Sequence, residues 1–397
     1  MHDTDRTPAN GRPQRAARRP LLLVGAAAVV ALGLVLAGLA AVDLWRNRTD
    51  APQWQANPAE STQPTPTAEA SPPPPKVISL SATGDIVMGN APHRLPPNNG
   101  KGFFDSVKSA IAADLAMGNL EEPLTVDTGA GKCGANSANC HQFRAPPEYA
   151  AHLRDAGFHL LNQANNHGYD YGSAGYENTQ KALEEHGLEH TGAPDQITVV
   201  DVDGVTVAVA GFSSYRWSNP LTDIPKAQQV IEKATSMADL VVVQVHMGAE
   251  GSDKTRVRPG TEWAFGENRG DPIKFSHAMI DAGADLVVGH GPHVMRALEF
   301  YKGRLIAYSL GNFAGGGGTL SRNGPLGLGA VLKVSLTAEG TWVDGELIST
   351  YMDSAGRPTL DSEHRTVALV QQLCKSDFPD TGAKLSKKGK ITPPEAG

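Results

Sequence analysis

The sequence predicts an α/β fold with mixed sheets, in which two packed sheets are flanked by helices, preceded by one membrane-spanning helix. Three observations lead to this prediction. Apolar strand-like runs alternate with segments of helical periodicity from residue 76 onward, which is typical of strands linked by helices. Several of the apolar runs end in a short polar cluster, and one long uncharged stretch precedes the whole pattern.

The uncharged stretch is Leu21–Val42, which is long enough for a helix to cross about 30 Å of hydrocarbon. Residues 1–20 form a basic tail that is expected to stay in the cytoplasm by the positive-inside rule. The domain that follows is then exported from the cytoplasm. A cleaved signal peptide is the alternative, with small residues near its end, and it exports the domain as well.

Composition divides the rest of the chain. Residues 43–75 are rich in Pro and Thr, cannot form a core and are interpreted as a linker. The main domain is expected over 76–355, and 356–397 is expected to be a C-terminal extension packed on it. The net charge of −7 gives no basic surface, so we expect no nucleic acid as a partner.

The periodicity assigns the elements of the domain in order. Residues 197–213 contain two strand-like runs around Asp203 and Gly204, a strong hairpin signal. The other strands are expected at 77–86, 114–121, 158–166, 239–248, 285–291, 294–301, 304–313, 330–337 and 341–353. Helices are expected at 105–113, 147–156, 173–186, 226–237 and 272–282.

The three cysteines suit an exported domain. Cys133 and Cys140 lie in a loop of small and turn-forming residues, where a disulfide is plausible in an oxidising compartment. A metal knuckle that includes the adjacent His141 is the alternative. Cys374 is left over in a C-terminal helical segment, where we expect it to be buried.

The strand-end clusters indicate a functional site. They read GDI, NLEE, NQANNH, HMGAE, GHGPH and SLGNF. Ligand sites in α/β folds gather beyond the carboxyl ends of strands, because loops and helix N-termini meet there. If these strands are neighbours, the clusters converge on one site.

The residue types in these clusters suit metal binding and proton transfer. Carboxylate, amide and imidazole groups are ligands for hard or borderline metals, and an imidazole can also donate a proton. The candidates are Asp85, Asn119, Glu121, Asn166, His167, His246, His290 and His293. For each of them a turn, a helix cap or a packed core residue is the alternative.

Two further residues are assigned supporting roles. Glu250 follows His246 closely and is a candidate to fix its tautomer. Asn312 belongs to the SLGNF cluster and is a candidate for contact with the substrate or with a ligand residue. The tract 315–318 of four glycines is interpreted as a flexible loop, or else as a cradle for an anion.

In this order and spacing, the motifs GDIVMG, GNLEE, NQANNHGYDYG, QVHMGAE, DLVVGHGPHV and AYSLGNF resemble the CapA family of capsule and poly-γ-glutamate synthesis. The resemblance covers about residues 77–350. The family is similar to a branch of the calcineurin-like metallophosphoesterases. That similarity implies a four-layer α-β-β-α sandwich with the site between two sheets.

The resemblance implies roles for the candidates. Asp85, Asn166 and His246 match metal ligands of the phosphoesterases, and His167 matches their general acid. Glu121 stands with Asn119 in the family's Asn-x-Glu position, as a ligand or a base. The terminal Gly-His-x-His motif of the phosphoesterases corresponds to His290 and His293, with one extra residue between the two histidines. Val87 replaces a usual histidine and Met247 a usual tryptophan, so the centre is expected to hold one divalent metal rather than two, or none.

Two functions follow from the resemblance. The first is a metal-dependent hydrolase that acts on a phosphoester or an anionic envelope polymer, in capsule or poly-γ-glutamate biosynthesis or processing. The second is a non-catalytic accessory or binding subunit of a polymer synthesis or export complex. The uncharged segment, independently of the resemblance, places the protein in the cell membrane with its domain on the outer side.

Overall fold

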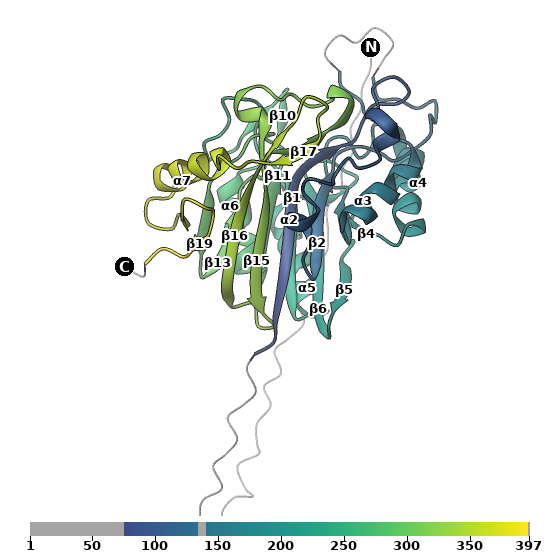
Figure 1. Cartoon of the computed structure of the whole chain (residues 1–397). Coiled ribbons are helices and arrows are strands. Elements are labelled where there is room, and N and C mark those ends of the chain that lie inside the picture. The colour runs from purple at the N-terminus through teal and green to yellow at the C-terminus, as the bar shows by residue number, and fades with distance from the viewer. Residues whose placement is uncertain (1–74, 134–139, 396–397) are drawn as a thin grey trace, which may run out of the picture. The chain divides into compact units, whose positions relative to one another are not determined.

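The computed structural model describes residues 75–133 and 140–395, which form a mixed-sheet α/β domain (Figure 1). The mixed α/β fold predicted from the sequence is therefore confirmed. The predicted basic tail, membrane anchor and most of the linker lie outside these residues. Among the described helices, none is both long and apolar enough to cross a membrane.

The first sheet has eight strands and carries both parallel and antiparallel pairs. Its order is β17-β16-β15-β1-β2-β3-β4, and β14 pairs with the end of β1. The strands are β1 (Val77–Val87), β2 (Leu115–Leu120), β3 (Leu160–Asn162), β4 (Glu189–Thr191), β14 (Asn312–Gly315), β15 (Leu328–Thr337), β16 (Trp342–Met352) and β17 (Pro358–Leu360). Strands β1 to β4 are parallel, so their carboxyl ends lie along one edge.

The second sheet has seven strands in the order β12-β13-β11-β8-β6-β5, with β7 beside β6. They are β5 (Thr198–Val202), β6 (Val205–Ser213), β7 (Asn219–Pro220), β8 (Leu240–His246), β11 (Leu286–His290), β12 (Leu298–Tyr301) and β13 (Arg304–Ala307). The predicted hairpin is β5 and β6, with positive φ at Asp203 and Gly204. Strands β6, β8, β11 and β13 are parallel.

A single apolar core joins the two sheets, and helices cover their outer faces. Leu80 and Met117 of the first sheet belong to the same buried cluster as Val243 and Val288 of the second. Figure 1 shows the first sheet in front of the second, with α3 and α4 at the right and α7 at the left. The helices are α2 (Lys108–Ile111), α3 (Ala150–Ala156), α4 (Gly172–Glu185), α5 (Ile224–Thr235), α6 (Pro272–Asp281) and α7 (Arg365–Asp377).

The helices fall into two sets according to the sheet on which they pack. Leu153 of α3 and Leu183 of α4 lie in a second apolar cluster, with Leu161 on the outer face of the first sheet. Helices α5 and α6 contact β6, β8 and β11 of the second sheet. The C-terminal residues join the main core through α7, where Val370 and Cys374 are buried.

Several expected elements are shorter in the structure. The helix expected at 105–113 has only the four residues of α2, and the strand expected at 158–166 is reduced to β3. The strand expected at 294–301 begins at Leu298, because the buried Arg296 before it bonds to Glu262 and to loop carbonyls.

The strand expected at 304–313 is wrong as a single element. It is divided between β13 of the second sheet and β14 of the first, so the chain crosses from one sheet to the other. Gly311, with φ of 64°, makes this crossing, and its carbonyl accepts a hydrogen bond from the backbone N–H of Asp85. A Cβ on Gly84 would lie 2.0 Å from the Gly311 oxygen. Only glycine at position 84 permits this approach.

We therefore expect Gly84→Ala to lower the free energy of unfolding by about 2–3 kcal/mol, because the added methyl group overpacks a backbone contact that cannot yield. Gly303→Ala is the matched control. Gly303 has open space around it, so the control suffers only left-handed strain of about 1 kcal/mol. Chemical denaturation measures both variants, and equal losses would contradict the proposed contact.

Candidate metal centre

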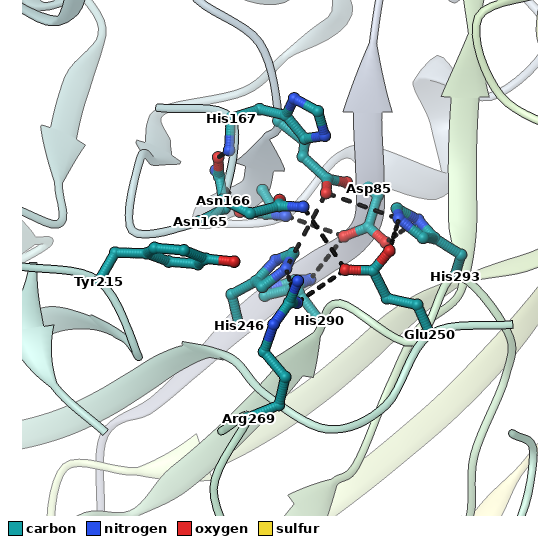
Figure 2. Close-up of polar contacts among 12 residues, drawn as sticks. Asp85, Asn165, Asn166, His167, Tyr215, His246, Glu250, Arg269, His290 and His293 are labelled. Atoms are coloured by element: carbon teal, nitrogen blue, oxygen red, sulfur yellow. Dashed lines mark hydrogen bonds and ion pairs between the residues drawn. The ribbon is translucent and has the colours of Figure 1, made fainter. Parts of the chain in front are cut away.

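The strand register brings the predicted polar residues together. In the first sheet Asp85 is aligned with Asn119, and Asn312 on β14 is also aligned with Asp85. In the second sheet His246 on β8 is aligned with His290 on β11. All five residues stand at strand ends, on the same side of the domain, and Figure 2 shows side chains from both sheets pointing toward one another.

The innermost group consists of Asp85, Glu121 and His293. One ligand atom from each of the three lies within 4.8 Å of the others. His293 Nδ1 is 3.1 Å from Asp85 Oδ2, and His293 Nε2 is 3.7 Å from Glu121 Oε1. Asp85 and Glu121 are fully buried, so two carboxylates meet one imidazole away from water.

Two more imidazoles flank this group from the second sheet. His290 Nδ1 is 3.8 Å from Asp85 Oδ1, and His246 Nε2 is 4.0 Å from Glu121 Oε1. Both rings are buried. These distances exceed hydrogen-bond length and leave room between the donor atoms.

Most of the inward-facing polar atoms have no hydrogen-bond partner within the described part of the chain. They are Asp85 Oδ2, both carboxylate oxygens of Glu121, Nδ1 of His246 and both ring nitrogens of His290. Each buried unpaired polar group costs roughly 1–3 kcal/mol, and ionised groups cost more. A divalent cation would satisfy several of these atoms at once. Mixed carboxylate and imidazole donors suit zinc, manganese or iron.

Burial and mutual charge set the protonation of the innermost group. Burial raises the pKa of Glu121 well above its usual range, and the Asp85 charge raises it further. Burial also acts to raise the pKa of Asp85, but the close contact and charge of His293 outweigh it and lower that pKa. Burial acts to lower the pKa of His293, but the charges of Glu121 and Asp85 hold it well above its usual range. The His293 proton thus balances the carboxylates.

The two flanking imidazoles are neutral. Burial lowers the pKa of His290 to about 4. Burial, and then the charge of Arg269, lowers the pKa of His246 well below its usual range. Neutral imidazole is the form that ligates metals, so both side chains are in the state that a metal requires.

Asn119 faces the centre differently from the prediction. Its amide nitrogen donates to Asp85 Oδ1 at 2.8 Å, and its oxygen accepts from the amides of Asn162 and Asn165. Because the oxygen already has two donors, the geometry does not present it as a metal ligand. Asn119 instead holds the Asp85 carboxylate in place.

His167 lies above the centre and belongs to a hydrogen-bonded chain. Its Nδ1 donates to Asp170 Oδ2 at 2.7 Å, and the ring packs on Phe143 with centroids 4.5 Å apart. Lys132 Nζ lies 2.5 Å from Asp170 Oδ1. Burial lowers the pKa of His167, against the charge of Asp170. With Nδ1 fixed by Asp170, Nε2 is the nitrogen left for proton transfer.

Glu250 is placed differently from the prediction as well. Its Oε1 pairs with Arg269 Nη1 at 2.7 Å, and its Oε2 lies 3.8 Å from His293 Nε2. The predicted orienting partner of His246 therefore contacts Arg269 and His293 instead. The amide nitrogen of Asn166 donates to Glu250 Oε1 at 3.5 Å, while its oxygen has no partner among the described residues. That oxygen is still available as a ligand.

Asn312 orients His293. Its Oδ1 lies 2.9 Å from His293 Nδ1, and its own amide nitrogen donates to the carbonyl of Leu326. The second bond fixes which end of the amide faces the histidine, so Nδ1 carries the proton. Nε2, which faces Glu121 and Glu250, is then the nitrogen with a lone pair when the ring is neutral.

Two cavities open beside the centre. One has a volume of about 560 Å³ and the other about 330 Å³, and both are lined by His141, His167, Glu250 and Phe265. Phe265 is 84% exposed, at the tip of a hairpin formed by β9 (Trp263–Ala264) and β10 (Glu267–Asn268). The centre is thus reached from two sides, past His167.

The sequence did not single out four residues of this region, which are Lys132, Tyr215, Trp217 and Arg269. Tyr215 and Trp217 stack with ring centroids 4.8 Å apart, and they lie in the loop that follows the strand β6. Their position after an apolar run was therefore a usable signal. Lys132 and Arg269 stand in loops without such a signal.

The remaining predictions concern loops. Cys133 and Cys140 form the predicted disulfide, which consumes both sulfurs and rules out the metal knuckle. The glycine tract is packed against neighbouring backbone rather than forming a flexible loop. Gly316 and Gly317 pack on the backbone of Met88 and Arg94, where any Cβ would clash. Their role is close packing at the end of β1.

The fold and the site define a class of protein: an α/β domain with a buried carboxylate and imidazole centre between two sheets, suited to a metal ion. Residues 79–316 match the family described as bacterial capsule synthesis protein PGA_cap, and the chain belongs to this family.

Two curated relatives are the capsule biosynthesis protein CapA of Bacillus anthracis and the PGA biosynthesis protein CapA of Bacillus subtilis (strain 168). The first is 31% identical over 59% of this chain and 59% of its own length. The second is 32% identical over 60% of this chain and 63% of its own length. The chain thus spans about three fifths of the length of the curated relatives it matches.

A solved structure with some likeness is the 5'-nucleotidase precursor from Thermus thermophilus. It has a TM-score of 0.41 and 13% sequence identity, and the match covers 77% of this chain and 60% of that one. A likeness of this size defines neither the fold nor the chemistry.

We expect Asn312→Ala to weaken Mn²⁺ binding by about 10–100-fold, because the ring of His293 loses the acceptor that sets its tautomer. Calorimetric titration of the purified chain measures the affinity. Asn323→Ala, at an exposed loop position, is the matched control and should bind as the unchanged chain does. Unchanged affinity in Asn312→Ala would show that Asn312 does not orient a ligand.

Proposed function

We propose that this protein is a membrane-anchored, extracytoplasmic member of its family, with a metal-dependent hydrolase centre that acts in capsule or poly-γ-glutamate biosynthesis or processing. One observation carries the catalytic part. Three carboxylate and imidazole side chains converge within 4.8 Å in a buried site, and two more imidazoles flank them with unpaired atoms. Such a cluster is costly to bury unless it serves a ligand.

The residues that would hold a divalent ion are Asp85, Glu121, His290 and His293. Bound there, the ion supplies a Lewis acid that polarises the scissile group and promotes ionisation of a water molecule. The chain itself supplies the proton. His167 is oriented by Asp170 so that Nε2 can protonate the leaving group, while Lys132 holds the other oxygen of Asp170.

The substrate that we propose is a phosphoester or an anionic envelope polymer. The two cavities that meet at His167 and Glu250 give a chain-like molecule space on both sides of the centre. Family membership supports the polymer. The phosphoester is supported by the similarity to metallophosphoesterases that the sequence motifs imply.

Export is proposed from two independent features. The uncharged segment Leu21–Val42, preceded by basic residues, suits a single-pass anchor with its N-terminus in the cytoplasm. The disulfide between Cys133 and Cys140 suits an oxidising compartment. Membrane anchoring would hold the domain close to a polymer-synthesis complex, which we propose as its partner.

His293→Ala tests the function. We expect it to lose bound metal and to reduce phosphodiester hydrolysis by more than the roughly 100-fold that loss of an orienting partner can cost. Elemental analysis and hydrolysis of bis(p-nitrophenyl) phosphate measure these effects. His93→Ala, at an exposed position, is the matched control and should retain both properties.

The same two variants separate the enzyme from an accessory subunit. In a strain that lacks the gene, we expect His93→Ala to restore the envelope polymer and His293→Ala to fail. Restoration by both variants, with normal protein levels, would contradict catalysis and would favour the binding role.

A further inference from the structure

Arg269 places a permanent positive charge inside the centre. Its side chain is 1% exposed, and burying a guanidinium is costly unless partners compensate it. Glu250 Oε1 lies 2.7 Å from Nη1, and Glu267 Oε2 lies 3.0 Å from Nη2. The guanidinium also lies over the ring of Tyr215, 5.6 Å from its centroid. Two carboxylates and one aromatic ring therefore compensate the charge of the guanidinium.

The backbone of Arg269 is held as firmly as its side chain. Its N–H donates to the carbonyl of Glu262, and its carbonyl accepts from the N–H of Gly248, two residues beyond the end of β8. Glu262 is itself fixed by two hydrogen bonds from the buried Arg296. The loop that carries the guanidinium is thus held in place by hydrogen bonds at the backbone of Arg269.

One N–H of this guanidinium points at His246. Nη1 lies 3.5 Å from His246 Nε2, and since arginine only donates, Nε2 accepts (Figure 2). A metal bound to this nitrogen would lie about 2.1 Å from it along the same lone pair. The N–H of Arg269 occupies that direction, and its charge would repel a second cation.

Beside Asp85, Glu121 and His290, by contrast, the centre holds no positive group from an arginine or a lysine of the described residues. Asp85 Oδ2, both oxygens of Glu121 and both nitrogens of His290 have no hydrogen-bond partner among the described residues. No guanidinium or ammonium group is paired with Asp85 or Glu121 in that part of the chain. A cation can therefore bind beside Asp85, Glu121 and His290, whereas the adjoining position at His246 is occupied by Arg269.

We propose that Arg269 stands in for a second metal ion, so that the centre binds a single divalent cation at Asp85, Glu121, His290 and His293. This inference rests on the proposed function, because it assumes that a metal binds. His246 then serves as an acceptor for Arg269 rather than as a ligand. Glu250 links the two positive positions, since its oxygens face Arg269 Nη1 and His293 Nε2.

Metal stoichiometry tests the proposal. The full chain is freed of metal and titrated with Mn²⁺, and bound metal is counted by calorimetry and elemental analysis. We expect one Mn²⁺ per chain, with the six-line electron paramagnetic resonance spectrum of an isolated ion. Arg269→Ala should open the second place and bind two ions, whose coupling broadens and splits that spectrum.

Two control variants accompany Arg269→Ala. Arg269→Lys keeps a charge in the loop and should still bind one ion. Arg304→Ala removes an arginine that pairs with Asp285, outside the centre, and should also bind one. Circular dichroism reports whether each variant is folded.

The outcomes distinguish this inference from the proposed function. Two coupled ions in the unchanged chain would overturn the role of Arg269 and leave the hydrolase proposal standing. A single ion in a folded Arg269→Ala variant would also overturn it. If no ion binds to the unchanged chain, both proposals fail. The count in the unchanged chain decides the matter even where Arg269→Ala does not fold.

Discussion

The rest of the centre depends on one constraint, which is that the buried carboxylate of Asp85 must be stabilised. It stands at the end of β1, and the crossing segment at Gly311 comes close enough to bond its N–H. Burial of a carboxylate is unfavourable, so the structure provides the amide of Asn119 and the imidazole of His293 around it. The amide network behind Asn119 and the acceptor Asn312 behind His293 exist to fix these two groups. The need to stabilise the buried Asp85 carboxylate thus accounts for the positions of these surrounding side chains.

The centre can be located from the sequence because it lies at the carboxyl ends of parallel strands. Parallel strands align their carboxyl ends, so a polar residue that follows an apolar run falls at the same edge as its counterparts. Asp85, His246 and His290 each follow such a run, and the register sets the two histidines side by side. The alternation of strands and helices likewise predicted the mixed sheets. Residue type and position within a strand were sufficient in these cases.

Other features depend on contacts that sequence periodicity does not encode. The run 304–313 has the pattern of one strand, but its division between two sheets depends on a carbonyl approaching Gly84 from a distant segment. The direction of the Asn119 amide is set by two donors on another strand and its following loop. Arg269 comes from a loop with no strand-end signal. Only the folded chain brings such groups together.

In the proposed single-ion centre, Arg269 supplies a fixed positive charge beside His246. A second metal must be captured from solution and requires its own ligands, whereas a guanidinium is always charged and is carried by the fold. Its charge is compensated by Glu250 and Glu267 rather than left free. What it supplies instead is order, since it fixes Glu250 near His293 and occupies the lone pair of His246. In the proposed function, the bound ion and the proton donor His167 then remain as the groups that would act on a substrate.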